Sequence, residues 1–263
     1  MDATQGSRTP FRFDSLAGFP LIHGVTTRDL ELPGEGDMNI AGRLPITEAL
    51  TNRHTWSSAI GVNADALVCG RQVHGINVRV VDERHRGLGA RDIEEALPQT
   101  DALITQSSNL PLMVYTADCV PVIAYDPVRH ALGLAHAGWR GTVGNIAGQL
   151  VAAMAAEFGS DPVDLIVKLG PSIGPCCYEV GDEVISAWSK SGLDPHSDAI
   201  RSADPRSHLD LWRANSLALE ASGVPSAHIE HSGLCTRCHA DRFFSRRAGQ
   251  GHRGLFATIG QLK

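Results

Sequence analysis

Short apolar runs separated by turn residues recur along most of the chain, and this pattern predicts strands more often than helices. Apolar, β-branched runs that end in glycine, proline or polar residues are typical of β-strands. The strands predicted in this way are 19–27, 66–73, 76–82, 101–105, 110–116, 120–125, 131–135, 165–169, 227–231 and 255–259. Because the connections are short, we expect largely antiparallel or mixed sheets.

Four segments carry the apolar spacing or the end signals of helices: 45–60, 142–158, 181–190 and 209–222. In 142–158, Thr142 could cap the start and Gly159 ends the pattern. Strands in runs with helices interspersed predict an α+β fold with mixed sheets. We expect a single domain over 11–263, a flexible tail at 1–10, and loops at 28–42 and 191–207.

Composition narrows the class of protein. The chain has 263 residues, of which 43% are hydrophobic, enough for one sizeable core. A net charge of −6 and the lack of a basic run argue against a nucleic-acid partner. No signal-peptide pattern and no membrane-spanning apolar stretch are visible. The six cysteines are therefore expected to be reduced, in a cytoplasmic protein.

Three residues are candidate ligands of one metal ion. His74, Cys119 and His136 each adjoin an apolar run and sit beside glycines or turn residues. Two imidazoles and a thiolate suit a catalytic zinc, which takes three protein ligands and keeps a fourth position open. Copper also binds such sites tightly. Alternatively, Cys119 and His136 could form a thiolate–imidazole nucleophile pair that needs no metal.

Five ordered motifs identify a resemblance to a known family. They are RQVHG at 71–75, TADCVPV at 116–122, HAGWRG at 136–141, GPSIGPCCYEV at 170–180 and FFSRR at 243–247. Together they resemble the purine nucleoside phosphorylase/laccase-domain family, also called YfiH-like proteins, polyphenol-oxidase-like proteins or peptidoglycan-editing factors. The resemblance implies a layered α/β/β/α sandwich. It also implies metal ligation by His74, Cys119 and His136, with Cys119 and His136 taking part in catalysis.

The resemblance implies a zinc enzyme that phosphorolyses adenosine, inosine, guanosine or methylthioadenosine and deaminates adenosine. Its partners would be a purine nucleoside and phosphate, and it would act as a monomer or small homo-oligomer without a membrane. Alternatives within the family are copper-dependent polyphenol oxidation and removal of misincorporated amino acids from peptidoglycan precursors. The sequence has no H-x-H pair of the kind that feeds a multicopper cluster. A non-catalytic zinc protein is disfavoured because structural zinc usually has four ligands.

Substrate and phosphate contacts are expected on three loops. Arg140 lies between glycines before the helix predicted at 142, where a helix start and a cation would bind phosphate and support catalysis. Arg246 and Arg247 are alternatives. Arg28 and Asn39 lie in a segment that resembles the family's substrate loop, although both could equally be ordinary loop residues.

The remaining candidates receive structural interpretations. Asp118 is expected to orient a ligand histidine or to support the loop, and His85 to be solvated. Adjacent cysteines rarely point at one site, so we assign packing roles to Cys176 and Cys177. The pattern CTRCH at 235–239 matches haem attachment, which we reject because no export signal is present. Cys235, Cys238 and His239 leave a second zinc site as an alternative.

Overall fold

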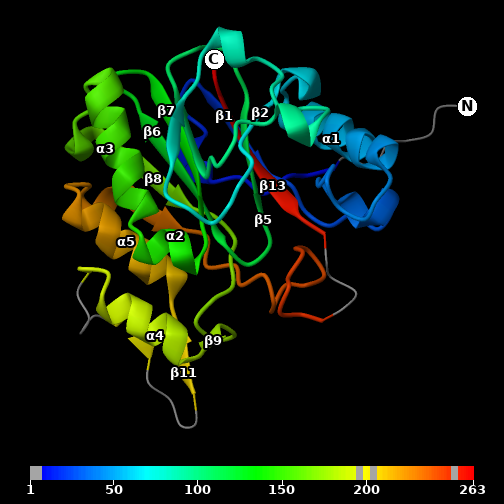
Figure 1. The fold of residues 1–263 in the computed structure, drawn as a ribbon. Helices are drawn as coiled ribbons and strands as arrows, with labels where there is room; N and C mark the ends of the chain where they lie inside the picture. Colours follow the sequence, from blue (N-terminus) through cyan, green and yellow to red (C-terminus); the bar gives the residue numbers. More distant parts are fainter. Residues whose placement is uncertain (1–7, 194–197, 202–205, 250–253) are drawn as a thin grey trace, which may run out of the picture.

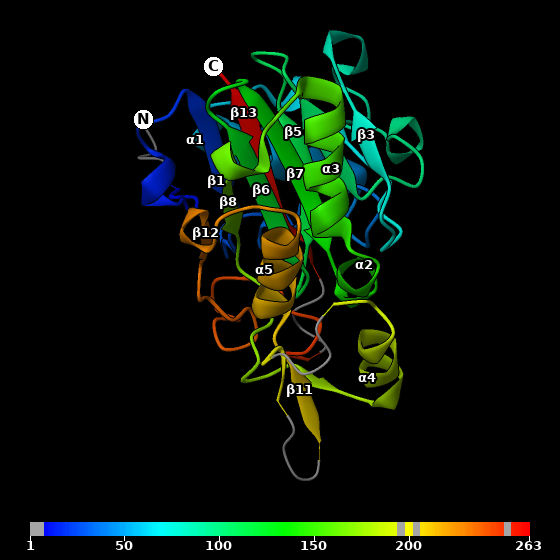
Figure 2. The same ribbon diagram turned by 90° about the vertical axis from the view of Figure 1, so that its left-hand side faces the viewer.

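The computed structural model describes residues 8–193, 198–201, 206–249 and 254–263. Two stacked β-sheets form the centre of the molecule, and helices cover both outer faces (Figure 1). The view turned by 90° shows α3 and α5 lying side by side in front of one sheet (Figure 2). No described helix is long and apolar enough to cross a membrane.

The larger sheet has the strand order β12-β8-β6-β7-β4-β3. Its strands are β12 (Ile229–His231), β8 (Ile166–Leu169), β6 (Val120–Asp126), β7 (Ala131–Ala137), β4 (Ala102–Thr105) and β3 (Val78–Val80). The second sheet has the order β1-β13-β5-β2. Its strands are β1 (Leu21–Val25), β13 (Phe256–Leu262), β5 (Leu112–Thr116) and β2 (Val68–Cys69). Both sheets mix parallel and antiparallel pairs, as expected.

Strand alternation explains how the layers pack. In β7, Leu132 and Leu134 join Leu112 of β5 in the core between the two sheets. Gly133 points the other way, and a Cβ there would lie 2.9 Å from Leu150 of α3. The strand therefore serves two cores at once, because successive side chains leave a strand on opposite faces.

Helices close both outer faces. Helices α3 (Ile146–Phe158) and α5 (Leu211–Ala221) cover the larger sheet. Helix α1 (Ile46–Ile60) covers the second sheet, where Trp56 and Ile60 share a core with Ile259 of β13. The order helix, sheet, sheet, helix confirms the predicted α+β sandwich.

The single helix predicted at 142–158 is wrong, because the segment forms two helices. Helix α2 (Trp139–Val143) ends before Gly144, and α3 begins after Asn145. Asn145 adopts φ 68°, and its side chain accepts a hydrogen bond from the Gly148 amide at 3.1 Å. Thr142 caps nothing: it lies inside α2, and its hydroxyl accepts a hydrogen bond from Asn215 of α5 at 3.0 Å.

Strands that follow one another in the chain are twice divided between the two sheets. The segments 66–73 and 76–82 shrink to β2 and β3, and these strands belong to different sheets. The next two strands, β4 and β5, likewise belong to different sheets. The turn at His74 and Gly75 therefore carries the chain from one sheet to the other. The strands predicted at 120–125 and 131–135 form the antiparallel hairpin of β6 and β7.

A small third sheet lies beside α4 (Asp182–Ser189). It is formed by β9 (Glu179–Val180), β10 (Ile200–Arg201) and β11 (Ser207–Leu209). The loop expected at 191–207 thus contains β10 and the start of β11, while 194–197 and 202–205 lie outside the described residues. Of the tail expected at 1–10, residues 1–7 also lie outside them, and Pro10 is buried.

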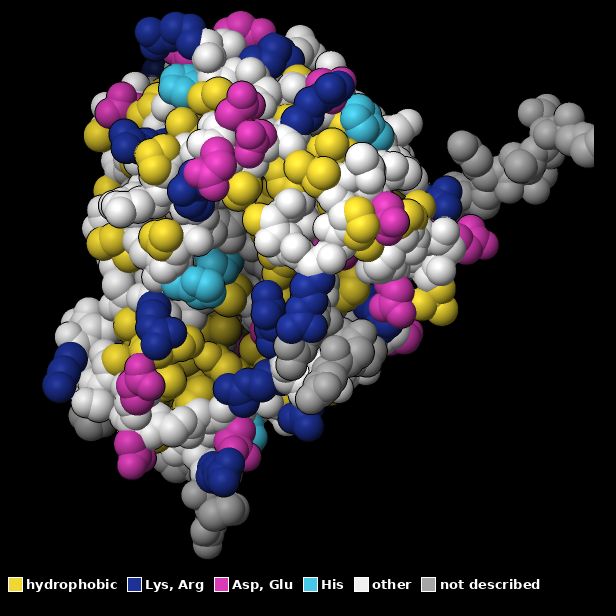
Figure 3. Space-filling view, turned by 45° about the vertical axis from the view of Figure 1, so that its right-hand side comes forward, with side chains coloured by type: hydrophobic (Ala, Val, Ile, Leu, Met, Phe, Trp, Pro, Cys, Tyr) yellow, Lys and Arg dark blue, Asp and Glu magenta, His cyan; other side chains and the backbone are white. Residues whose placement is uncertain are grey.

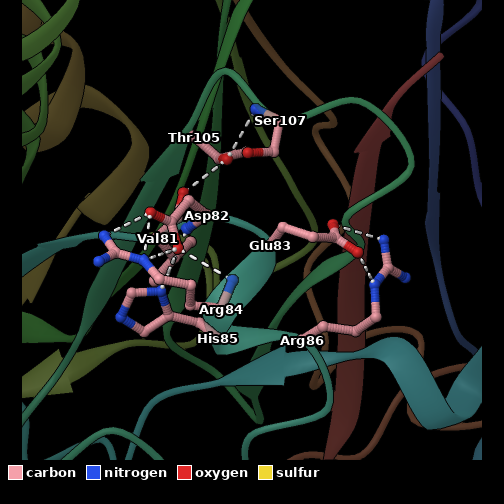
Figure 4. A network of polar contacts seen from close by, with 8 residues as sticks. All are labelled: Val81, Asp82, Glu83, Arg84, His85, Arg86, Thr105 and Ser107. Carbon is pink, nitrogen blue, oxygen red and sulfur yellow. Dashed lines mark hydrogen bonds and ion pairs between the residues drawn. The ribbon is translucent and has the colours of Figure 1, made fainter.

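A polar network fixes the loop after β3 (Figure 4). Asp82 accepts a hydrogen bond from the Arg84 amide at 3.0 Å, and the Nδ1 atom of His85 lies 3.0 Å from its Oδ1. Arg86 pairs with Glu83. His85, expected to be solvated, keeps 28% of its side chain exposed while its ring contacts Asp82.

Candidate metal centre

The structure brings His74, Cys119 and His136 together. One ligand atom from each of these residues, the ligand trio below, lies within 4.8 Å of the other two. Val120 pairs with Ala137 across β6 and β7, so Cys119 and His136 meet at the same end of the hairpin. The His74 ring approaches from the turn between the sheets, with its centre 4.7 Å from that of His136.

One buried carboxylate, Asp101, supports two members of the trio. Its Oδ1 lies 2.9 Å from Nδ1 of His136 and accepts a hydrogen bond from the His74 amide at 3.0 Å. Its Oδ2 accepts from the amides of Val73 and Gly75. Asp101 thereby holds the turn in which His74 has φ 62°. By engaging Nδ1 of His136, it also fixes the orientation of this ring and leaves Nε2 as the atom that points away from Asp101.

The trio favours a thiolate. Burial raises the pKa of the Cys119 thiol, but the charges and hydrogen bonds of His136 and His74 outweigh it and lower this pKa to about 6. Burial lowers the pKa of His136, but the Cys119 thiolate and the bond to Asp101 raise it to about 9. Because a thiolate is both a metal ligand and a nucleophile, this electrostatic pattern suits both interpretations of the trio.

Gly138 leaves the space in which the trio sits. A Cβ at this position would lie 2.9 Å from Sγ of Cys119 and 2.9 Å from Cδ2 of His74. Contacts that short require a ligand side chain to move. The glycine after the HA pair of the HAGWRG motif is thus needed for the close approach of α2 to the ligands.

A cleft of about 570 Å³ opens beside the trio. It is lined by Asn39, Ala41, Gly70, Arg71, Gln72, His74, Ile93, Tyr115, Thr116, Ala117, Cys119, His136, Arg246 and Leu255. The space-filling view shows a hollow with histidine side chains at its edge and lysine or arginine side chains nearby (Figure 3). Its volume lies in the range of small-molecule sites.

The sequence-predicted contact residues divide into two sets. Asn39 and Arg246 line the cleft. Arg28 and Arg140 do not belong to the residues that line the cleft. Arg28 pairs with Glu35 and is only 8% exposed at its side chain. Arg140 is 58% exposed, stacks on Trp139 at 4.2 Å and lies 3.4 Å from Glu183.

Asp118 supports a loop and not a ligand histidine. With φ 82° it turns the chain between β5 and β6. Its Oδ1 accepts a hydrogen bond from Thr236 at 2.6 Å, and its Oδ2 accepts one from the Arg247 amide at 3.2 Å. The carboxylate that orients His136 is Asp101, which the sequence marked only as the first residue of a predicted strand. Arg71 of the RQVHG motif was likewise not assigned a role.

A second group of metal-type ligands exists among the described residues. It consists of Cys176, Cys177, Cys235 and Cys238, and one sulfur from each lies within 4.8 Å of the others. Cys177 packs against the core of the larger sheet, as predicted, but the premise that adjacent cysteines do not point at one site is wrong, because Cys176 and Cys177 both belong to this group. His239, offered with Cys235 and Cys238 as a zinc ligand, lies outside this group.

Comparison with known families decides the classification. Residues 46–263 match the model of a family described as multi-copper polyphenol oxidoreductase laccase. The chain belongs to this laccase family. The resemblance drawn from the five motifs is thereby confirmed.

Similar proteins of the laccase family carry two kinds of names. A purine nucleoside phosphorylase, YlmD of Geobacillus stearothermophilus, is 40% identical over 82% of this chain and 79% of its own length. An adenosine deaminase, RL5 of an unknown prokaryotic organism, is 41% identical over 80% of each chain.

Solved structures of similar proteins share the fold. The crystal structure of YlmD from Geobacillus stearothermophilus matches with a TM-score of 0.91 at 35% identity, covering 99% of this chain and 98% of that one. The structure of YfiH from Bacillus licheniformis also gives 0.91, at 31% identity and 97% coverage of both chains. These matches show the layered fold, and the names of the relatives support an enzyme of the laccase family.

Proposed function

We propose that this chain is a zinc-dependent purine nucleoside phosphorylase that also deaminates adenosine. The observation that carries the proposal is the ligand trio of His74, Cys119 and His136 at the edge of a cleft large enough for a nucleoside. Relatives of about 40% identity are named for each of the two activities. Adenosine, inosine, guanosine and methylthioadenosine are the proposed substrates.

The trio fits a metal ion on its own geometry. His136 has its Nδ1 engaged by Asp101, so Nε2 is the atom left to ligate a metal, which would displace the proton that the raised pKa of this ring favours. His136 and His74 lower the pKa of the Cys119 thiol to about 6, which favours the thiolate at neutral pH, and Gly138 leaves room beside it. Zinc held by three protein ligands keeps a position for water or substrate and acts there as a Lewis acid. The proposed ligands are therefore His74, Cys119 and His136.

The cleft residues would bind and orient the two substrates. Phosphorolysis breaks the bond between the sugar C1′ and the purine nitrogen and forms a bond from C1′ to a phosphate oxygen, while the purine takes up a proton. Arg246 and Arg71 in the lining offer guanidinium groups for the phosphate dianion. Asn39 accepts a hydrogen bond from the Ala41 amide through Oδ1, so it would present its NH₂ group to the nucleoside.

Polyphenol oxidation, which the family description names, is less well supported by the site. A multicopper oxidase needs several histidines around a multinuclear cluster. Among the described residues, the two groups that could hold a metal contain only His74 and His136 as histidines.

We also propose a cytoplasmic location, which the six free cysteines support because oxidising compartments favour disulfides.

A product screen tests the proposal. Purified protein is incubated with adenosine with and without phosphate, and adenine, ribose 1-phosphate and inosine are separated by chromatography. We expect adenine and ribose 1-phosphate only with phosphate, inosine without phosphate, and inosine together with its phosphorolysis product hypoxanthine when phosphate is present. Oxygen uptake with a polyphenol, or amino-acid release from peptidoglycan precursors, without any nucleoside product would refute it.

Two substitutions separate the metal mechanism from a thiolate–imidazole pair. Cys119→Ala removes a ligand or a nucleophile, so both models expect both nucleoside activities to disappear. His74→Ala discriminates, because His74 has no role in a simple pair of Cys119 and His136. Loss of zinc together with both activities supports the metal. Near-normal turnover of His74→Ala after chelation would show that the thiolate is the catalyst.

A further inference from the structure

A cluster of four cysteines lies apart from the ligand trio in sequence. We define the cysteine cluster as Cys176, Cys177, Cys235 and Cys238. All four are free thiols, and Cys176 and Cys238 are exposed. The two pairs come from separate segments, and Cys176 and Cys238 are 62 positions apart. Packing of the two loops alone does not require four sulfur atoms at one point, so this arrangement indicates a binding site.

The spacing of the sulfur atoms matches a metal tetrahedron. Sγ of Cys238 lies 3.6 Å from that of Cys176 and 3.5 Å from that of Cys177, and all four lie within 4.8 Å. A zinc ion with bonds of about 2.3 Å to four thiolates places the sulfur atoms about 3.8 Å apart. The observed separations are close to this value and well beyond the roughly 2.05 Å of a covalent disulfide.

The surrounding backbone is arranged to support sulfur ligands. The Gly174 amide donates a hydrogen bond to Sγ of Cys235 at 3.2 Å, and the Cys238 amide donates to the same sulfur. A Cβ on Gly174 would lie 3.4 Å from Sγ of Cys176 and 3.2 Å from Cβ of Cys235. Amide donors of this kind stabilise the charge of ligating thiolates. Cys235 and Cys238 also have the C-x-x-C spacing common among zinc ligands.

We infer that the cysteine cluster binds a structural zinc ion that fastens the loop after β8 to the loop after β12. Four protein ligands fill the tetrahedron, which is the mark of a structural site and not a catalytic one. Tetrahedral sulfur coordination selects zinc or iron among common metals. This site goes beyond the proposed nucleoside chemistry and does not depend on it.

The two loops joined by the zinc ion contact the turn that precedes Cys119. Ser172 and Cys235 form a β-bridge, and the Thr236 amide donates to the Ser172 carbonyl at 2.9 Å. Thr236, which lies between the two cysteines of the C-x-x-C pair, donates its hydroxyl hydrogen to Asp118. Asp118 precedes Cys119 in the chain. By holding Cys235 and Cys238, the zinc ion therefore fixes Thr236, which in turn supports the Asp118 turn next to Cys119.

Metal analysis of the full-length protein tests this site. The wild type and the variants Cys238→Ser, His74→Ala and Cys69→Ala are purified under reducing conditions, and zinc and iron per chain are measured. We expect Cys238→Ser to lose one zinc equivalent relative to the wild type, whatever the trio binds. Cys69→Ala is the matched control, because Cys69 is buried outside both ligand groups, and it should retain the wild-type zinc content.

Cobalt substitution covers the case in which Cys238→Ser fails to fold. Cobalt(II) added to metal-free His74→Ala should give thiolate-to-cobalt charge-transfer absorption of tetrahedral four-thiolate strength at one equivalent. The same zinc content in wild type and Cys238→Ser, or one iron per chain at this cluster, would overturn the assignment. So would an intact mass two hydrogens lighter, which would indicate a disulfide. Nucleoside assays are not needed, so failure of the proposed function would be seen separately.

Discussion

At the scale of single residues, the candidate metal centre is supported by one carboxylate that the sequence did not reveal. Asp101 contacts the ring of His136 and the amides of three successive residues of the turn that carries His74. The ligand residue types could be predicted because zinc prefers imidazole and thiolate. Their support could not, since an aspartate at the start of a predicted strand has no distinguishing pattern.

Gly138 offers a direct test of how tightly the trio is packed. Gly138→Ala should lower metal affinity by about 10–100-fold, the range seen when the support of metal ligands is disturbed. The reason is the 2.9 Å approach of the new Cβ to both Cys119 and His74. The measurement is zinc affinity by competition with a chromophoric chelator. Gly18→Ala is the control, because a Cβ there meets nothing within 4 Å. Equal affinities in the two variants would contradict the packing argument.

At the scale of elements, the hydrophobic pattern located the strands better than their partners. The β6–β7 hairpin could be predicted because its turn at Asp126 and Pro127 is local, and it places Cys119 beside His136. The break between α2 and α3 was missed because apolar spacing continues through Gly144 and Asn145. Only the backbone of Asn145, with φ 68°, ends one helix and begins the next.

This break changes which arginine should bind phosphate. The sequence placed Arg140 before a long helix, but Arg140 lies in a five-residue helix and pairs with Glu183. Arg246, from the loop before β13, lines the cleft. We expect Arg246→Ala to raise the KM for phosphate by about 10–100-fold, since a hydrogen bond to a charged group contributes about 1.5–3 kcal/mol. Arg140→Ala should change it less than about two-fold.

Initial rates at varied phosphate concentration, with zinc content measured alongside, decide between the two arginines. Both variants should keep the zinc content of the wild type, because neither residue belongs to the ligand trio. A larger rise in KM for Arg140→Ala than for Arg246→Ala would place the anion site at α2.

At the scale of the whole molecule, long-range arrangement is what the sequence could not supply. The layered sandwich followed from family resemblance, whereas local patterns did not reveal that β2 and β3 belong to different sheets. For the same reason the sequence pointed to only half of the cysteine cluster, Cys235 and Cys238, since its two pairs lie about 60 positions apart and meet only through the fold. Short-range periodicity carries information about exposure, and it does not state which distant segments meet.

The N-terminal segment is joined to the sheet through a buried histidine, and this predicts how stability depends on pH. His23 of β1 is 4% exposed, and its Nε2 accepts a hydrogen bond from the Phe13 amide at 2.9 Å. Burial, together with the charges of Arg12 and Lys168, lowers the pKa of His23 from 6.5 to about 4. The neutral ring is therefore the form that fits the fold.

Between these two pKa values the unfolded chain binds a proton that the folded chain does not, so stability falls as pH falls. The contribution of neutral His23 is fully present above pH 6.5 and is lost progressively down to about pH 4. At about 1.4 kcal/mol per pH unit, the loss amounts to about 3 kcal/mol. His23→Gln keeps an acceptor for Phe13 but cannot titrate. As pH falls from 6.5 to about 4, the free energy of unfolding of the wild type should therefore decrease relative to that of this variant. Urea unfolding of both proteins from pH 4 to 8 measures the difference, and parallel pH profiles would show that His23 does not titrate as its burial requires.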